Sequence, residues 1–243
     1  MHRTPRELRL AAALVEASDT LADDFDTGRQ LRRLADHCVE LLAARAAGVM
    51  VIDDGRAVTL TGSGPEQEPA LDLLRAQADG GPCWDCYASG QALAPVSVGA
   101  AHAAGRWPEF TERALRHGVG STFAVPLRGH GRTLGALAVF RSGPAGHPRP
   151  DAVPDVRVAQ VLADGTALGL GNHDRYARCR TRAGQLQEAL SSRVRIEQAK
   201  GMLAERWNTD VDAAFAALRQ YARRHRLPLD RVARAVVERA VDL

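Results

Sequence analysis

Ile196-Glu197-Gln198-Ala199-Lys200-Gly201 is the most informative stretch of this sequence. Lys200 is the only lysine among the 243 residues, and the other 31 basic side chains are arginines. Ile196 is one of two isoleucines. In a chain so rich in arginine and alanine, we would expect an ordinary surface lysine to have been replaced by arginine. The two side chains differ physically, because arginine has a planar, forked guanidinium and lysine a compact point charge. The stretch therefore indicates a site that needs these side chains, with chance survival of one exposed lysine as the alternative.

The residues around Lys200 have the spacing of one helix face. Arg193, Glu197, Lys200 and Ala204 follow one another at intervals of four, three and four residues. Gly201 adjoins this face, and glycine inside a helix costs about 1 kcal/mol relative to alanine. Either a ligand that approaches the bare backbone or a close helix crossing would compensate for this cost.

Three helices are predicted at the C-terminal end. The first includes 190–206, the second starts at Asn208 or Thr209, where Thr209-x-x-Asp212 resembles a capping box, and the third starts at Asp230. A basic loop over 223–228 is expected to stop the second helix. Each helix alone is too short to be stable in water, so the three should share one small core. The expected core residues are Val211, Ala214, Phe215, Leu218, Ala222, Val232, Ala233, Val236, Val237 and Val241.

Residues 171–190 are predicted to form a connecting helix. Within it, apolar or small residues recur every three or four positions, a heptad spacing typical of a coiled coil. They are Tyr176, Cys179, Ala183, Leu186 and Leu190. We call this set the heptad seam. It predicts a homodimer contact, and packing against the chain's own first domain is the alternative.

The N-terminal part alternates helix and strand patterns. The expected helices cover residues 6–45 (with a break near 23–28), 69–78 and 107–117. The expected strands are 46–53, 56–61, 121–127 and 133–140, and Asp53-Asp54-Gly55 is a hairpin signal between the first two. Residues 83–104 are expected to be irregular, 141–154 to be a loop, and a helix to follow from about Val156. This order predicts an α+β fold in which helices flank an antiparallel sheet.

Composition and charge bound the class of protein. No apolar run approaches the roughly 18–20 residues that cross a bilayer, which predicts no membrane span. Four cysteines in a chain of this length form no disulfide framework, so cytoplasmic residence is the default expectation. Residues 171–243 carry 15 basic and 9 acidic side chains, a net charge of +6, whereas residues 1–170 carry 17 and 20. The basic tail favours a polyanionic partner, although a solvated helical surface would look similar.

The sequence lacks the common catalytic motifs. There is no Gly-Lys-Ser/Thr P-loop, no Gly-x-Ser-x-Gly elbow and no His-Glu-x-x-His. We therefore expect no enzyme. Cys83-Trp84-Asp85-Cys86 is the one reactive-looking motif, and a zinc site would need two more ligands. A structural role is the main interpretation of Cys83 and Cys86, and a redox role is the alternative.

Residues 189–204 (Ala-Leu-Ser-Ser-Arg-Val-Arg-Ile-Glu-Gln-Ala-Lys-Gly-Met-Leu-Ala) closely resemble the ANTAR domain, and the resemblance extends over about 180–241. The matching pairs further along are Ala214-Phe215, Leu218-Arg219, Ala222-Arg223 and Val232-Ala233. The resemblance implies a three-helix antiterminator that binds paired RNA hairpin loops in nascent mRNA as a dimer and prevents a terminator from forming. The RNA-binding residues that it implies are Arg193, Glu197, Lys200, Gly201, Arg206, Arg219 and Arg223.

Residues 20–170 resemble a GAF sensory domain. The pieces that carry this resemblance are Gly81-Pro82-Cys83 leading to Tyr87, Arg106-Trp107-Pro108-Glu109-Phe110, Ala124-Val125-Pro126-Leu127 and Leu134-Gly135-Ala136-Leu137. A GAF domain implies a regulatory module that senses a small-molecule ligand or an upstream signalling protein, and the cofactor is unknown. The predicted organisation is therefore a GAF-like domain at 1–170, a connecting helix at 171–190 and an ANTAR domain at 180–243 that overlaps this helix.

Two other functions stay open at this point. The three-helix unit could act as a DNA-binding helix-turn-helix whose third helix presents Arg231, Arg234 and Glu238. The chain could also be a redox sensor that acts through Cys83 and Cys86. We predict as the leading function an RNA-binding antiterminator that is regulated through its GAF domain.

Overall fold

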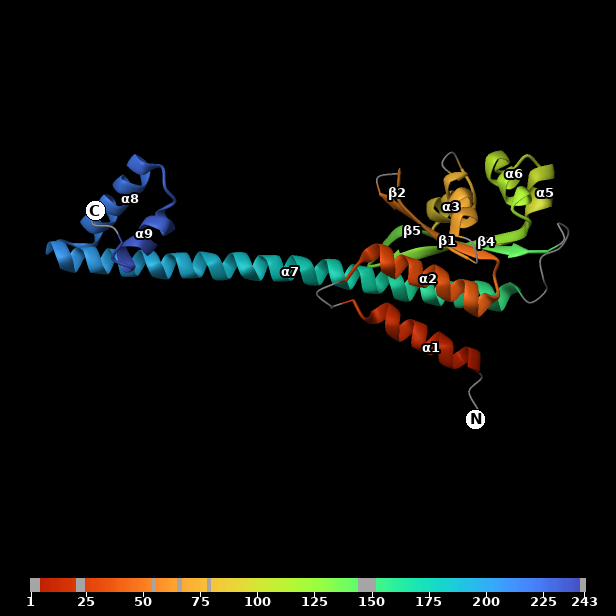
Figure 1. Ribbon diagram of the computed structural model, residues 1–243, viewed down its shortest axis with the longest axis horizontal. Coiled ribbons are helices and arrows are strands. Elements are labelled where there is room, and N and C mark those ends of the chain that lie inside the picture. The colour runs from red at the N-terminus through yellow and green to blue at the C-terminus, as the bar shows by residue number, and fades with distance from the viewer. Residues whose placement is uncertain are drawn as a thin grey trace. The chain divides into compact units, whose positions relative to one another are not determined.

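The computed structural model describes residues 5–20, 25–53, 56–64, 67–77, 80–143 and 152–240. The chain forms two compact units, Met1–Arg175 and Tyr176–Leu243. The first contains a sheet with helices on both faces, and the second contains helices (Figure 1).

The first unit is built on a five-stranded sheet with the strand order β2-β1-β5-β4-β3. The strands are β1 (Ala46–Asp53), β2 (Arg56–Ser63), β3 (Leu93–Ser97), β4 (Val119–Gly129) and β5 (Arg132–Ser142). Every neighbouring pair is antiparallel, with β5 in the centre between β1 and β4. The predicted α+β fold with an antiparallel sheet is thus confirmed. The turn residues Asp54 and Gly55 of the first predicted hairpin lie outside the described residues.

Helices bury both faces of this sheet. The helices α2 (Thr27–Leu42) and the start of α7 (Ala152–Trp207) cover one face, with α1 (Pro5–Ser18) packed outside them, and α3 (Gln67–Arg75), α4 (Pro82–Ser89), α5 (Val98–Ala103) and α6 (Pro108–Arg116) cover the other (Figure 1). Successive side chains of β5 alternate between the two cores: Leu137 and Val139 join the first, whereas Ala138 and Phe140 join the second. A strand buried on both sides is a continuous apolar run, as the sequence of β5 shows.

The expectation that residues 83–104 are irregular is wrong. This segment holds α4, β3 and α5. Pro82 occupies the first turn of α4, where its missing N–H is no loss, and Gly90 ends the helix at a φ of 63°. Ser97 caps α5 by accepting a hydrogen bond from the backbone N–H of Ala100. The three elements are five to eight residues long, so their apolar periodicity is too short to stand out from the surrounding glycines and small residues.

The helix α7 is a single element of 56 residues. It begins at Ala152, not near Val156, and Pro154 lies in its first turn, where proline is tolerated. It continues through the predicted connecting segment and Gly184 to Trp207, so the connecting helix and the first C-terminal helix are one. The prediction that a long helix leads to the C-terminal helices is confirmed. Among the described residues, no helix is both long and apolar enough to span a membrane.

The second unit packs the end of α7 against α8 (Val211–His225) and α9 (Leu229–Val237). Of the predicted core residues, Ala214, Leu218, Ala222, Val232, Ala233 and Val236 are buried, Phe215 and Val237 are half-buried, and Val241 lies outside the described residues. Val211 was expected in this core but is 46% exposed, because it is the first residue of α8 and lies at the solvent-facing end.

Two boundaries of α8 differ from expectation. Asp210, not Thr209, caps the helix, since its carboxylate accepts hydrogen bonds from the backbone N–H groups of Asp212 and Ala213. At the other end, residues 223–225 were predicted to begin a loop but form the last turn of the helix. The chain leaves the helix at Arg226, which adopts a left-handed conformation with a φ of 53°. Basic side chains in a last turn interact favourably with the helix dipole, so this basic run extends the helix.

Candidate nucleic-acid interface

The aromatic ring of Phe215 contacts two predicted RNA-binding cations. Lys200, on α7, places its Nζ atom 4.9 Å from the ring centroid. Arg219, one turn after Phe215 on α8, places its Cζ atom 4.4 Å from the same centroid. Both distances fall within the range of cation–π contacts. We call Glu197, Lys200, Phe215 and Arg219 the Phe215 cluster.

Glu197 completes the cluster through an ion pair with Lys200. The Nζ atom of Lys200 donates to both carboxylate oxygens of Glu197, at 3.1 and 2.9 Å. The Lys200 side chain is only 13% exposed, whereas that of Glu197 is 57% exposed. The lone lysine of the chain is thus a largely covered group whose ammonium is shared between a carboxylate and an aromatic face.

The structure therefore brings Glu197, Lys200 and Arg219 together around a side chain that the sequence prediction assigned to the core. Phe215 is half-buried, with its body against the three-helix core. The sequence signal that could have identified it is the i, i+4 spacing of Phe215 and Arg219 on one helix, which places a ring beside a guanidinium.

The other four predicted residues are exposed on the same two helices, α7 and α8. Arg193 is exposed one turn before Glu197 on α7, and Arg206 is exposed in the last turn of α7. Arg223 is exposed one turn beyond Arg219 on α8. Gly201 is exposed next to Lys200, and a Cβ atom built on it would meet no atom within 4 Å among the described residues. Open space at Gly201 argues against a close helix crossing within the chain as the reason for this glycine.

Two further contacts lie in this unit, an ion pair that joins two helices and a ring contact within α8. Arg195 on α7 forms an ion pair with Asp230 on α9, with an Nη2–Oδ1 distance of 2.7 Å. Tyr221 and His225, on the last turns of α8, place their ring centroids 4.2 Å apart. Tyr221 is half-buried and Trp207 is 37% exposed, so the Trp207 ring is the more accessible of these two aromatic groups.

The cysteine motif of the first unit lies in an apolar environment. Cys83 and Cys86 are free thiols buried in the core under the α3–α6 face of the sheet. Burial raises the pKa of the Cys83 thiol far above its ordinary value, and burial raises the pKa of Cys86 to about 12. The thiolate is the reactive form of cysteine, so both groups are poor nucleophiles and poor metal ligands at neutral pH. This environment disfavours the redox interpretation.

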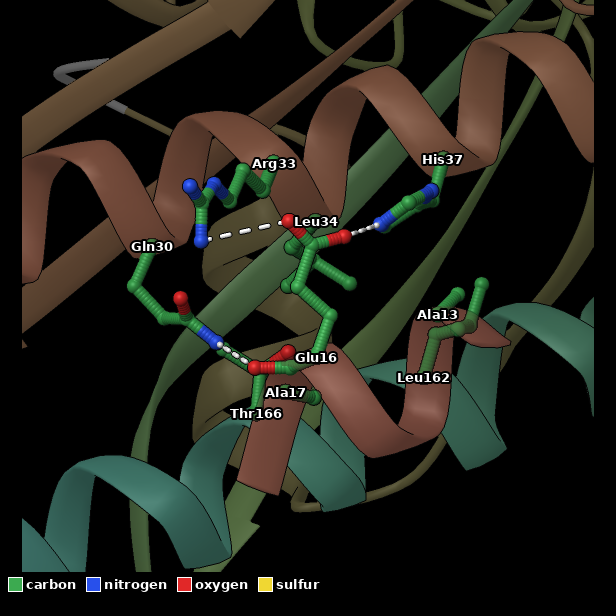
Figure 2. A pocket seen from close by; sticks show the side chains of 9 residues that line it. All are labelled: Ala13, Glu16, Ala17, Gln30, Arg33, Leu34, His37, Leu162 and Thr166. Atoms are coloured by element: carbon green, nitrogen blue, oxygen red, sulfur yellow. Dashed lines mark hydrogen bonds and ion pairs between the residues drawn. The ribbon is translucent and has the colours of Figure 1, made fainter. Parts of the chain in front are cut away.

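A small polar pocket lies on the opposite side of the sheet, between α1, α2 and α7 (Figure 2). Glu16 of α1 reaches across it and pairs with Arg33 at 3.2 Å and with the Nε2 atom of His37 at 2.9 Å. The Nε2 atom of Gln30 donates to the backbone oxygen of Glu16 at 3.3 Å. The floor is formed by buried residues of the first core, among them Leu34 and Leu162. The pocket is thus bridged by the Glu16–Arg33 ion pair and the Glu16–His37 hydrogen bond.

Comparison with known structures gives distant likenesses to the first unit. Free methionine-R-sulfoxide reductase from Neisseria meningitidis is 20% identical over 71% of this chain and 96% of that protein, with a TM-score of 0.46. The GAF domain of phosphoenolpyruvate-protein phosphotransferase from Acinetobacter is 14% identical over 68% of this chain and 95% of that domain, with a TM-score of 0.43. No curated protein matches the chain.

Family models match most of the chain. The model of the GAF domain matches residues 29–170, which is more than half of the chain and includes the whole sheet. The model of the ANTAR domain matches residues 184–237, which include the Phe215 cluster, the end of α7, and all of α8 and α9. The chain therefore belongs to the GAF domain family and is a GAF and ANTAR domain regulator.

Proposed function

We propose that this protein is a transcription antiterminator that binds hairpin loops in nascent mRNA through its ANTAR domain. The observation that carries the proposal is the Phe215 cluster, where predicted RNA-binding residues from α7 and α8 meet around one ring. RNA sequence is recognised chiefly in unpaired loops, by stacking, base-edge contacts and backbone charge. The exposed arginines Arg193 on α7 and Arg219 and Arg223 on α8 provide positive charge on these two helices. Action on nascent transcripts would take place in the cytoplasm.

A binding assay that compares RNA hairpins with duplex DNA at matched salt tests this proposal. Preference for the RNA hairpin supports antitermination, whereas preference for the duplex favours the DNA-binding alternative through Arg231 and Arg234 of α9. Sequencing of RNA crosslinked to the protein in cells would identify the transcripts. The proposal would be rejected if the protein bound no RNA hairpin and if crosslinking recovered no transcript.

The GAF domain is proposed to regulate RNA binding and to have no enzymatic activity. The burial of Cys83 and Cys86 favours sensing of a small molecule or a signalling protein over a redox mechanism. A signal that binds one conformation of the protein more tightly would shift the population towards it. The test compares RNA affinity of reduced and oxidised protein and of a Cys83→Ser/Cys86→Ser variant. A redox switch requires a difference that the double variant abolishes.

A homodimer formed through the heptad seam is part of the proposal. Leu186 and Leu190 are 72% and 59% exposed on α7, an uncommon state for leucines at successive heptad positions. Pairing with the same face of a second copy would cover them. Light scattering at micromolar concentration tests this proposal, and a monomer that still binds RNA normally would contradict it.

A further inference from the structure

We infer that Arg219, supported by Phe215, is the platform on which an unpaired RNA base stacks, and that Lys200 positions this platform without contacting phosphate. The inference rests on the proposed function and assigns separate roles to residues that the sequence prediction grouped together as RNA-binding. It follows from three properties of the Phe215 cluster: the coverage of Lys200, the exposure of Arg219 and the balance of charge.

Lys200 has little capacity left for a phosphate. Its ammonium has three donors, and two hydrogen bonds go to the Glu197 carboxylate. The Phe215 ring lies 4.9 Å from the Nζ atom, and the side chain is only 13% exposed. A phosphate would have to displace a carboxylate that is already paired. The Glu197–Lys200 pair is also neutral as a unit, so it attracts a polyanion weakly.

Arg219 has the opposite character. It is exposed, and no ion pair joins it to a carboxylate within residues 176–240, the described part of this unit. Its guanidinium lies against the Phe215 ring, which leaves the outer side of the cation facing solvent. Bases of single-stranded RNA stack both on the planar guanidinium of arginine and on aromatic rings. An arginine supported by a ring is less free to move and loses less entropy when a base stacks on it.

Lys200 determines where this platform lies. Phe215 is on α8 and Lys200 on α7, so the contact of the ammonium with the ring joins the two helices at the position of the platform. A longer, planar guanidinium at position 200 would not fit the same covered space between Glu197 and Phe215. This accounts for the one lysine in a chain whose other basic residues are all arginines.

The test uses RNA hairpins that share one stem and carry a randomised loop. The hairpin that the wild-type protein binds best is then compared with copies in which one loop base at a time is replaced by an abasic nucleotide. An abasic copy keeps every phosphate and loses only the stacking group. We expect at least one loop position at which base removal weakens binding about tenfold or more. Arg219→Gln should abolish this discrimination.

The charge-balanced variant Glu197→Gln/Lys200→Met isolates the role of the lysine. It keeps the net charge and removes the ion pair. Its RNA affinity and its base discrimination should fall, while the slope of log affinity against log salt stays unchanged. Arg223→Gln is the matched control, since loss of a phosphate contact lowers that slope by about one and leaves base discrimination intact. Circular dichroism and thermal unfolding verify that each variant is folded.

Each outcome decides the inference. A slope that falls by about one in Glu197→Gln/Lys200→Met, with discrimination retained, would make Lys200 a phosphate contact and overturn its positioning role. Equal binding of all abasic copies by the wild type, or discrimination that survives in Arg219→Gln, would overturn the platform. If the wild type binds no hairpin of the pool, the proposed function itself fails.

Discussion

Arg195 on α7 donates from its Nε atom to the Oδ1 atom of Asp230 on α9, at 2.8 Å. Both side chains are largely covered, with exposed fractions of 24% and 32%. The contact joins the long helix to the last helix of the ANTAR domain. It also places Asp230 in the first turn of α9, where a negative charge interacts favourably with the helix dipole.

Replacement of Asp230 by alanine should therefore loosen α9. Hydrogen bonds to charged groups contribute about 1.5–3 kcal/mol when they are well covered, and partial exposure reduces this, so we expect a loss of about 1–2 kcal/mol. Hydrogen exchange of the α9 amides should become faster by about tenfold. Glu205→Gln, at an exposed site on α7, is the control and should leave exchange unchanged. Unaltered protection of α9 in Asp230→Ala would show that apolar packing alone holds this helix.

Asp155 should make the stability of the GAF domain depend on pH. Burial would raise the pKa of Asp155, but hydrogen bonds from Arg141 and Arg6 outweigh it and hold the pKa below its ordinary 3.8. A lowered pKa contributes stability above pH 3.8, and this contribution is lost as the pH falls through the pKa of the folded protein. The thermal midpoint of Asp155→Asn should thus lie below that of the wild type near neutral pH, and the gap should shrink below pH 3.8.

The control for this pH series is Glu112→Gln. Glu112 pairs with Arg116 at 3.9 Å, with both side chains about two-thirds exposed, so the pair contributes little at any pH. A gap between Asp155→Asn and wild type that stays constant down to pH 2 would mean that the charge of Asp155 is irrelevant to the fold.

Gly201→Ala should separate stability from RNA binding. The added methyl group meets open space, so alanine should stabilise α7 by about 1 kcal/mol through helix propensity. If RNA approaches the bare backbone there, affinity should fall although stability rises. Gly184 is a matched control, because it lies in the same helix and its Cβ would also meet no atom. Gly184→Ala should stabilise the protein and leave RNA affinity unchanged, and equal affinity in both variants would remove Gly201 from the interface.

The four cysteines should differ sharply in reactivity. Cys179 is exposed, whereas Cys38, Cys83 and Cys86 are buried, and burial raises the pKa of Cys38 to about 12. Iodoacetamide at neutral pH should modify Cys179 in the folded protein and the other three only after unfolding. Peptide mapping by mass spectrometry reports each site. Rapid modification of Cys83 or Cys86 in folded protein would reopen the redox interpretation.

Cys179 also reports on the proposed dimer. It is part of the heptad seam, so in a parallel pair of α7 helices it would meet the same residue of the second copy. Mild oxidation should then produce a disulfide-linked dimer on a non-reducing gel. Leu186→Glu/Leu190→Glu should suppress this product, since like charges would meet in the seam. Equal crosslinking of that variant would show that the product arises from random collision.

The long elements were predictable from sequence, and the short ones were not. The apolar strands β4 and β5 and the amphipathic α2 are long enough to repeat their pattern and so to show it. The prediction for residues 83–104 failed because α4 and α5 have about two turns or fewer and β3 is a short strand. The ends of the two helices are set by capping at Gly90 and Ser97 and cannot be found from periodicity. The cap of α8 was misplaced by one residue for a related reason: Thr209 and Asp210 are both good capping residues, and only the backbone geometry selects Asp210.

The candidate site was predictable as a set of residues but not as an arrangement. The helix spacing of Glu197 and Lys200 anticipated their ion pair at i, i+3. The contact of Lys200 with Phe215 joins two helices, and no pattern within either helix contains that information. The sequence also does not show how far each side chain is exposed to solvent. It therefore could not distinguish the largely buried side chain of Lys200 from the exposed one of Arg219.

Because α7 contributes to the core of the first unit, this core can be completed only after α7 has been synthesised. Ala13 of α1 shares one buried cluster with Leu162 and Ala163 of α7, about 150 residues later in the chain. The sheet is translated in full by Ser142, yet α1 and α2 alone leave the core on the side of Val125 and Leu137 incomplete until α7 leaves the ribosome. Long-range closure of this kind is slow and exposes apolar surface in the meantime. A nascent chain arrested just before α7 should therefore be a strong client of chaperones, and one extended to the end of α7 a weak one.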